Sequence, residues 1–263
     1  MLVFSTLHIF SSSPVTIMAQ AFDELPIIFG DPRQPKATPP SDPKARREPF
    51  ETKATILPKS HVRRRGCLAL PCDILFERDQ PVILRDGTTI YTDVFRPAHT
   101  DTKCPAIVAW SSYGKDGGLG NQNFDDFPFR LGVPLYDLSE FQKWEGPDPA
   151  YWVLHGYAVV NPDARGVGYS EGDIYTVGSQ EAQDGADLID WVGEQEWCNG
   201  KVGMSGNSYL AVMQWHIAAQ KPKHLAAIAP VVALNSVRQH CLLTTSSGKA
   251  SRTCFEKALC LEA

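Results

Sequence analysis

One serine of this chain stands in a setting that could support covalent chemistry. Ser208 follows the short apolar segment 202–204 and the small residue Gly206, and a long apolar run begins at Leu210. This order predicts a nucleophile elbow, a sharp strand-to-helix turn that lifts one serine above the end of a parallel sheet. The chemistry would be acyl transfer, in which the serine hydroxyl attacks an ester or amide carbonyl and forms a covalent intermediate.

The flanking residues support the elbow, although one of them departs from the usual pattern. The second glycine of such turns, two positions after the serine, is replaced by Leu210. As an alternative, Ser208 could be an ordinary N-cap, a position where serine is common. Residues 210–219 leave no polar face, which is typical of a buried helix, and Pro222 stops that helix. A buried helix behind the serine favours the elbow.

Further segments predict the sheet that would carry this serine. The continuous apolar runs 106–110, 157–160, 202–204 and 225–229 are typical of parallel strands buried on both faces. Apolar residues at helical spacing predict a helix over residues 179–194. Asp86 and Gly87 separate two further apolar runs, a strong signal for an antiparallel hairpin. We expect an α/β fold, with a mostly parallel sheet, helices on both faces and a preceding antiparallel hairpin.

The connection from residue 114 to residue 150 is unusually long and rich in aromatic residues. It would leave the sheet at the carboxyl end of a strand, where such folds bind their ligands. Long loops of this kind are usually functional, but aromatic rings are also common in hydrophobic cores. Its aromatic residues therefore belong either to a functional loop or to a satellite core; they are Phe124, Phe127, Phe129, Tyr136, Phe141 and Trp144.

Composition excludes several classes of function. The net charge is −5 and the one basic run, 63–65, is short, so no nucleic-acid partner is expected. Seven cysteines without a C-x-x-C spacing predict reduced thiols and no metal site. No run is long enough to span a membrane, and no Lys or Arg precedes Arg33, so a secretory n-region is missing. We therefore expect a cytoplasmic protein without a membrane partner, and the sequence gives no oligomeric state.

Three stretches together resemble the X-Pro dipeptidyl-peptidase and cocaine-esterase-like (CocE/NonD) family of α/β-hydrolases. The first is the hairpin of residues 84–97, and the second is an Asp-x-Arg-Gly-x-Gly-x-Ser-x-Gly signature at 163–172. The third is the elbow at 206–209. The resemblance covers residues 71–234 and implies an α/β-hydrolase-type sheet, no cofactor or metal, and a small-molecule ester, amide or peptide substrate.

The resemblance also assigns three site residues. It implies that Ser208 is the nucleophile, and that the backbone N–H of Tyr209 and the hydroxyl of Tyr113 form the oxyanion hole. Such donors stabilise the charge that develops on the carbonyl oxygen. From the residues alone, the favoured interpretation of Tyr113 is a loop tyrosine that closes a turn before Gly114. Asp163 and Arg165 we interpret as scaffold beside the site, because an Arg–carboxylate pair can hold a loop.

The usual base and acid of the mechanism are missing. In α/β-hydrolases an Asp or Glu and then a His follow the nucleophile. No Asp follows Ser208, and the later histidines are His216, His224 and His240. His240 alone would lie on the correct side of the sheet, but no acid lies between Ser208 and it. We therefore expect a fold that is incomplete at its C-terminus, a truncated product or incomplete gene model that is inactive by itself.

These observations divide the chain into three parts and leave alternatives. Prolines among charged and small polar residues predict a disordered tail over residues 1–65. Residues 66–235 form a partial α/β-hydrolase domain, and residues 236–263 form a divergent C-terminal tail. A non-catalytic pseudo-hydrolase or interaction module is the competing class. A nucleotide-binding protein that uses Gly166 and Gly168 is a weaker alternative, because the G-x-G-x-x-G pattern is not completed.

Overall fold

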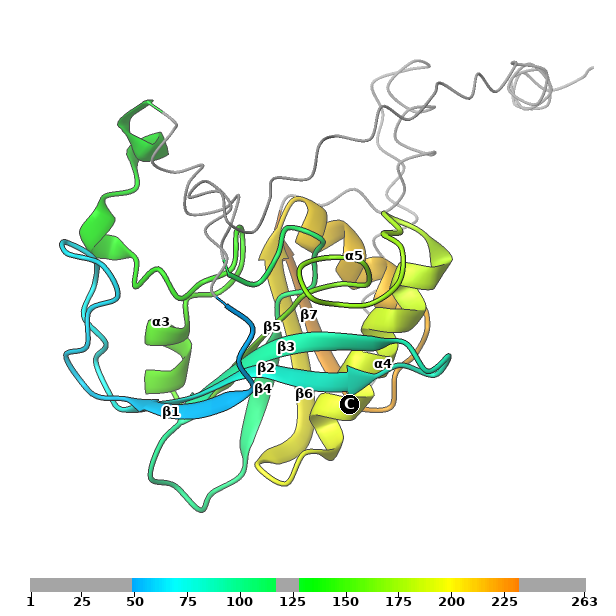
Figure 1. The fold of residues 1–263 in the computed structure, drawn as a ribbon, viewed down its shortest axis with the longest axis horizontal. Coiled ribbons are helices and arrows are strands. Elements are labelled where there is room, and N and C mark those ends of the chain that lie inside the picture. The colour runs from blue at the N-terminus through cyan, green and yellow to red at the C-terminus, as the bar shows by residue number, and fades with distance from the viewer. Residues whose placement is uncertain (1–48, 117–127, 232–263) are drawn as a thin grey trace, which may run out of the picture. The chain divides into compact units, whose positions relative to one another are not determined.

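The computed structural model describes residues 49–116 and 128–231 (Figure 1). All of these residues fall within one compact unit of the chain. Its strands are β1 (Lys53–Leu57), β2 (Ile74–Ile83), β3 (Thr89–Pro97), β4 (Cys104–Val108), β5 (Ala158–Pro162), β6 (Cys198–Asn207) and β7 (Leu225–Val231). Its helices are the 3-10 helices η2 (Pro128–Gly132) and η3 (Leu135–Asp137), and the α-helices α3 (Pro149–Leu154), α4 (Ser179–Glu194) and α5 (Tyr209–Ala218).

The seven described strands form one mixed sheet in the order β1-β2-β3-β5-β4-β6-β7. Strands β5, β4, β6 and β7 are parallel to one another, and β1, β2 and β3 are joined to them by antiparallel pairing. The hairpin predicted around Asp86 and Gly87 joins β2 to β3. The parallel half carries the elbow, because β6 ends one residue before Ser208.

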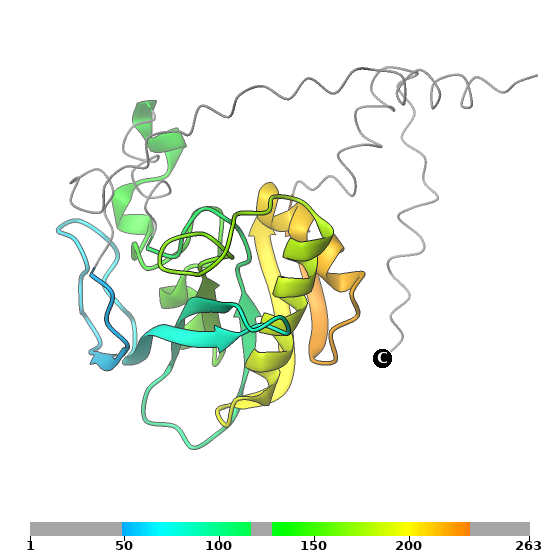
Figure 2. The same cartoon turned by 45° about the vertical axis from the view of Figure 1, so that its right-hand side comes forward.

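Helices cover both faces of this sheet, as predicted. Alternate residues of β5 divide between two cores: Ala158 and Val160 face the core that contains α4 and α5, while Val159 faces the core that contains α3. Figures 1 and 2 show α3 on one face of the sheet and α4 with α5 on the other. α4 has the predicted limits. In α5 the five consecutive residues from Leu210 to Gln214 are buried.

The long aromatic connection contributes to a core and to the surface. Phe141 is buried in the α3 core, with its ring centroid 5.7 Å from that of Phe95. Phe129 and Tyr136 are exposed. Phe124 and Phe127 lie outside the described residues. The satellite-core alternative therefore holds for Phe141.

The predicted tail boundary at residue 65 is wrong for residues 49–65. Strand β1 pairs along its length with β2, from Lys53 opposite Arg78 to Leu57 opposite Ile74. The side chains of β1 are mostly exposed, so its sequence lacks the apolar signal of a strand, and main-chain pairing orders it instead. The rest of the predicted tail, residues 1–48, and the predicted C-terminal tail, 236–263, lie outside the described residues.

Candidate active site

The chain turns sharply at Ser208, between β6 and α5. Its φ is 52° and its ψ is −113°, a backbone conformation that non-glycine residues rarely adopt and that costs on the order of 1–3 kcal/mol. Ser208 occupies the N-cap position of α5, yet its side chain makes no capping hydrogen bond to a described backbone group. The strand, turn and helix predicted for the elbow are therefore present, and the N-cap alternative lacks its hydrogen bond.

Gly206 explains why a leucine can follow the serine. A Cβ at position 206 would lie 2.5 Å from both the Cβ and the Cδ2 of Leu210, and φ of Gly206 is 149°. The turn therefore brings position 206 against the first turn of α5, and only one of the two positions can carry a side chain. In this chain the glycine stands before the serine and Leu210 fills the space after it.

Tyr209 is the first residue of α5, and a hydrogen bond of its side chain holds it in place. Its hydroxyl hydrogen bonds the carboxylate of Glu181 in α4, with O–O distances of 2.7 and 2.6 Å. Burial and this carboxylate raise the pKa of Tyr209. The first N–H groups of a helix have no intrahelical acceptor, so the backbone N–H of Tyr209 is available beside Ser208.

Tyr113 lies in the turn that follows β4, next to Tyr209. The two ring centroids are 5.5 Å apart, with 50° between the ring planes. Burial raises the pKa of Tyr113, and the carboxylate of Glu145 raises it further. The structure therefore brings together the three residues predicted for the site: Ser208 and Tyr209 are consecutive, and Tyr113 packs on Tyr209.

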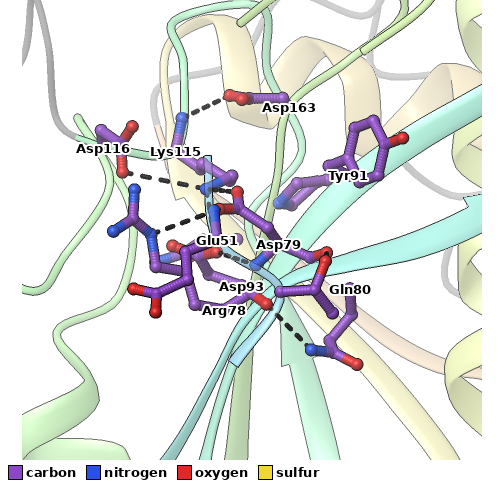
Figure 3. A network of polar contacts seen from close by, with 12 residues as sticks. Glu51, Arg78, Asp79, Gln80, Tyr91, Asp93, Lys115, Asp116 and Asp163 are labelled. Carbon is purple, nitrogen blue, oxygen red and sulfur yellow. Dashed lines mark hydrogen bonds and ion pairs between the residues drawn. The ribbon is translucent and has the colours of Figure 1, made fainter. Parts of the chain in front are cut away.

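Lys115 anchors the turn that carries Tyr113. Its ammonium lies 2.6 Å from the carboxylate of Asp79 in β2 and 2.9 Å from that of Asp93 in β3. Its backbone N–H donates to the carboxylate of Asp163, which follows β5, over 2.6 Å. Figure 3 shows Lys115 among these carboxylates, with Asp116 beside them. The Lys115 side chain is buried, so the ion pairs are shielded from water and link the turn to β2 and β3.

A second buried lysine holds the same turn from the other side. The Nζ of Lys143 donates to the carbonyl of Ser111 over 2.8 Å and also to the carbonyl of Pro162. Burial lowers the pKa of Lys143 to about 8 and raises that of the neighbouring Asp163 to about 6. Both shifts follow from the cost of keeping a charge away from water.

Arg165 joins three elements behind the site, in agreement with its predicted role as scaffold. Its Nε and Nη2 atoms donate to the two carboxylate oxygens of Asp184 over 2.7 and 2.8 Å. Its Nη1 donates to the hydroxyl of Thr88 over 2.6 Å, and Nη2 lies 2.8 Å from Asp86. The bidentate pair thus ties the loop after β5 to α4 and to the β2–β3 hairpin.

Neither described histidine after Ser208 stands beside it. His224 immediately precedes β7, and its ring Nδ1 lies 3.1 Å from the carbonyl of Gly200, near the start of β6. His216 is eight residues along α5, about 12 Å down the helix axis at about 1.5 Å per residue. His240 lies outside the described residues. In residues 49–116 and 128–231, no group of three His, Cys, Asp or Glu side chains could hold a metal ion.

Several residues around the site were missed from the sequence. Two of them are Glu181 and Lys115. The other missed residues are Asp79, Asp93, Lys143 and Glu145. Asp93, which precedes the apolar residues Val94 and Phe95 in β3, was an available signal for a buried ion pair. Among the described residues, no helix is long and apolar enough to cross a membrane.

Comparison with known proteins gives consistent matches. A family model described as X-Pro dipeptidyl-peptidase (S15 family) matches residues 86–255. Cocaine esterase from Rhodococcus sp. (strain MB1 Bresler) is 36% identical over 152 residues, which cover 58% of this chain and 22% of that protein. An Xaa-Pro dipeptidyl-peptidase from Lactobacillus helveticus is 30% identical over 190 residues, covering 56% of this chain and 24% of that protein.

A solved structure extends the similarity to the fold. A CocE/NonD family hydrolase from Staphylococcus aureus superposes with a TM-score of 0.56 at 33% identity, over 68% of this chain and 30% of that one. Together with the mixed sheet, this similarity confirms the predicted α/β-hydrolase-type fold. The chain spans about a quarter of the length of the curated relatives it matches.

Proposed function

Because the chain belongs to the X-Pro dipeptidyl-peptidase (S15) family, we propose that Ser208 is the nucleophile of a serine hydrolase that cleaves an ester or an amide. The reaction would pass through an acyl-enzyme on the Ser208 hydroxyl. The family supports hydrolase chemistry in general, and the assignment of Ser208 rests on the geometry of this chain.

The observation that carries the proposal is the backbone of Ser208. Ser208 has a strained backbone conformation, with φ at 52°. No capping hydrogen bond to a described group compensates for this strain. Strain of this kind persists where the surrounding structure enforces it, and it is concentrated at functional sites. Its consequence here is an exposed serine at the carboxyl end of a parallel strand, followed directly by the first N–H groups of α5.

In the proposed reaction, the Ser208 oxygen attacks the carbonyl carbon of the substrate while a base takes the hydroxyl proton. The carbonyl π electrons move onto oxygen, and the Tyr209 N–H and the Tyr113 hydroxyl would donate hydrogen bonds to that oxyanion. Each such donor is worth about 3–4 kcal/mol of the barrier. The C–O or C–N bond then breaks, the leaving group takes the proton, and water hydrolyses the acyl-serine ester.

The competing proposal is a non-catalytic chain, and the missing base favours it. A serine hydroxyl is a weak nucleophile until a base takes its proton. His224 contacts the carbonyl of Gly200 near the start of β6, and His216 is eight residues along α5. The only acids after Ser208 are Glu256 and Glu262. His240 is the remaining candidate for the base. On this alternative the chain would retain the elbow without turning over substrate.

Covalent labelling separates the two proposals. The 263-residue chain is treated with an alkyl fluorophosphonate, which loses fluoride when a serine oxygen attacks phosphorus, and the adduct is located by peptide mass spectrometry. The hydrolase proposal predicts an adduct on Ser208 that S208A abolishes. S179A, a change at an exposed serine at the start of α4, should leave labelling unchanged. A folded chain without an adduct on Ser208 would favour the non-catalytic alternative.

One relative is named an esterase and another a dipeptidyl-peptidase. These names suggest two classes of substrate. We propose a small-molecule ester or amide or a proline-containing peptide as the substrate. Hydrolysis of a p-nitrophenyl ester series and of an Xaa-Pro anilide by the same preparation would distinguish them. Loss of both activities in S208A would assign them to the same site.

A further inference from the structure

Residues 143–146, which we call the strap, cross the carboxyl ends of three parallel strands. Lys143 donates to the carbonyl of Ser111, just after β4, and to that of Pro162, the last residue of β5. Glu145 contacts Asn207, the last residue of β6. The strap therefore links the strand ends from which Tyr113 and Ser208 emerge.

Glu145 holds Asn207 at two points. Its carbonyl oxygen accepts the Asn207 backbone N–H over 3.0 Å, and its Oε1 accepts a side-chain N–H of Asn207 over 3.2 Å. Asn207 directly precedes Ser208, whose own N–H donates to the carbonyl of Val231 over 3.1 Å. Hydrogen bonds from two neighbouring segments thus fix the backbone that enters the elbow.

The conformation and burial of Glu145 in the strap are energetically unfavourable. Glu145 has a φ of 62°, in the region that favours glycine. Its Oε2 is buried, with no hydrogen-bond partner among the described residues, and a buried acceptor without a donor destabilises the fold. At position 146 a Cβ would lie 3.1 Å from the Cβ of Ala109, so the strap lies directly on the sheet.

Glu145 also acts on the other side of the site. Its carboxylate is the charge that adds to burial in raising the pKa of Tyr113, so it lies within electrostatic reach of that hydroxyl. The Tyr113 hydroxyl is protonated at neutral pH and can therefore donate a hydrogen bond. The Glu145 side chain therefore affects Ser208, through Asn207, and also the hydroxyl of Tyr113.

We propose that Glu145 is a positioning residue of the reaction, which fixes Asn207 and thereby holds Ser208 in its strained conformation beside Tyr113. This inference rests on the proposed function of Ser208. Glu145 acts through Asn207 and does not itself touch the substrate. A displacement of the nucleophile by about 1 Å can cost about 100-fold in rate, so a loose strap should slow the chemical step.

The test compares Glu145→Ala with the near-isosteric Glu145→Gln, using fluorophosphonate labelling of the full chain at 25 °C. Saturation kinetics separate probe binding (KI) from the chemical step (kinact). We expect E145A to lower kinact about 10- to 100-fold with KI changed less than about twofold. E145Q retains an oxygen that accepts from Asn207 and should recover most of that loss. E196A, which changes an exposed glutamate, is the matched control.

Three outcomes are distinguishable. If the wild-type chain is labelled and E145A has the same kinact as wild type, the positioning role is overturned. Equal losses in E145A and E145Q would overturn it too, because the contact with Asn207 would then not be the cause. Unlabelled wild type would instead remove the assignment of Ser208 itself.

A second measurement does not depend on activity. Amide hydrogen exchange of Asn207 is followed by NMR in chain labelled with ¹⁵N-asparagine, and the signals are assigned with N207D. E145A should accelerate exchange at the side-chain amide of Asn207, whose acceptor it removes, while E145Q should protect that amide. Exchange that is the same in E145A as in wild type would show that Glu145 does not hold Asn207, and would also overturn the proposal.

Discussion

The hydroxyl of Tyr209 and the carboxylate of Glu181 are hydrogen bonded, with oxygen separations of 2.7 and 2.6 Å. The same carboxylate accepts the indole N–H of Trp110 over 3.1 Å and the backbone N–H of Val177 over 2.7 Å. Glu181 is almost fully buried. One carboxylate therefore ties the end of β4, the start of α4 and the first residue after the elbow.

Glu181→Ala should destabilise the fold, because it leaves the buried indole N–H of Trp110 and the part-buried donors of Tyr209 and Val177 without their acceptor. An unsatisfied buried group costs about 1–3 kcal/mol, so we expect the free energy of unfolding to fall by at least about 2 kcal/mol. Urea denaturation followed by tryptophan fluorescence measures it. E194A changes an exposed residue of the same helix and should stay within about 0.5 kcal/mol of wild type. Equal stability of the two variants would contradict the role of Glu181.

Tyr113→Phe should slow the labelling of Ser208 without unfolding the chain. The ring that packs on Tyr209 is kept and only the hydroxyl is lost. Removal of one oxyanion donor typically lowers the rate about 10²- to 10³-fold. The kinact for the fluorophosphonate measures this effect, and Y136F, at an exposed tyrosine, is the control. A rate in Y113F equal to that of Y136F would assign Tyr113 to the turn alone.

Arg165→Ala and Arg85→Ala should differ strongly in their effect on stability. Asp184, the bidentate partner of Arg165, is 1% exposed, and loss of one partner of a buried pair costs about 3–5 kcal/mol. The side chain of Arg85, which pairs with Asp187, is 53% exposed, and such surface pairs are worth about 0.2–1 kcal/mol. Urea midpoints compare the variants. Similar losses would show that burial does not control these pairs.

Asp163 predicts a pH dependence of stability. Burial raises its pKa from 3.8 to about 6, so the folded chain binds this proton more tightly than the unfolded chain does. The contribution of Asp163 to the free energy of unfolding therefore falls as the pH rises from about 4 to about 6. Asp163→Asn keeps an oxygen that accepts the Lys115 N–H and removes the titration.

Unfolding measured from pH 4 to pH 7 should show a smaller decline in D163N than in wild type. D173N changes an exposed carboxylate and should retain the wild-type curve. Parallel curves for wild type and D163N would mean that the buried carboxyl titrates near its ordinary pKa.

Local sequence patterns were sufficient for the frame of this site. The turn signal Asp86-Gly87, the apolar spacing of α4 and the small residue before Ser208 each act within a few positions of the chain, so the hairpin, the helix and the elbow could be predicted. The resemblance added Tyr113, whose type alone did not separate a catalytic role from a structural one. No base is described beside the elbow, and the candidate His240 lies outside the described residues.

The residues that hold the site could not be found in this way. Lys143 and Glu145 resemble charged loop residues in contact with water, and their partners are carbonyl and amide groups that are distant in sequence. Which backbone groups meet at the ends of β4, β5 and β6 depends on strand order and register, which no single segment encodes. β1 was missed for a related reason, since its exposed side chains leave main-chain pairing as its main source of order.

The most direct test of the central claim is the mass of the purified 263-residue chain after treatment with the fluorophosphonate. The account predicts one phosphonyl group on Ser208, lost in S208A and retained in S179A. A folded chain in which Ser208 remains unmodified, under conditions that label a reference serine hydrolase to completion, would contradict it and identify the elbow as a non-catalytic feature of this chain.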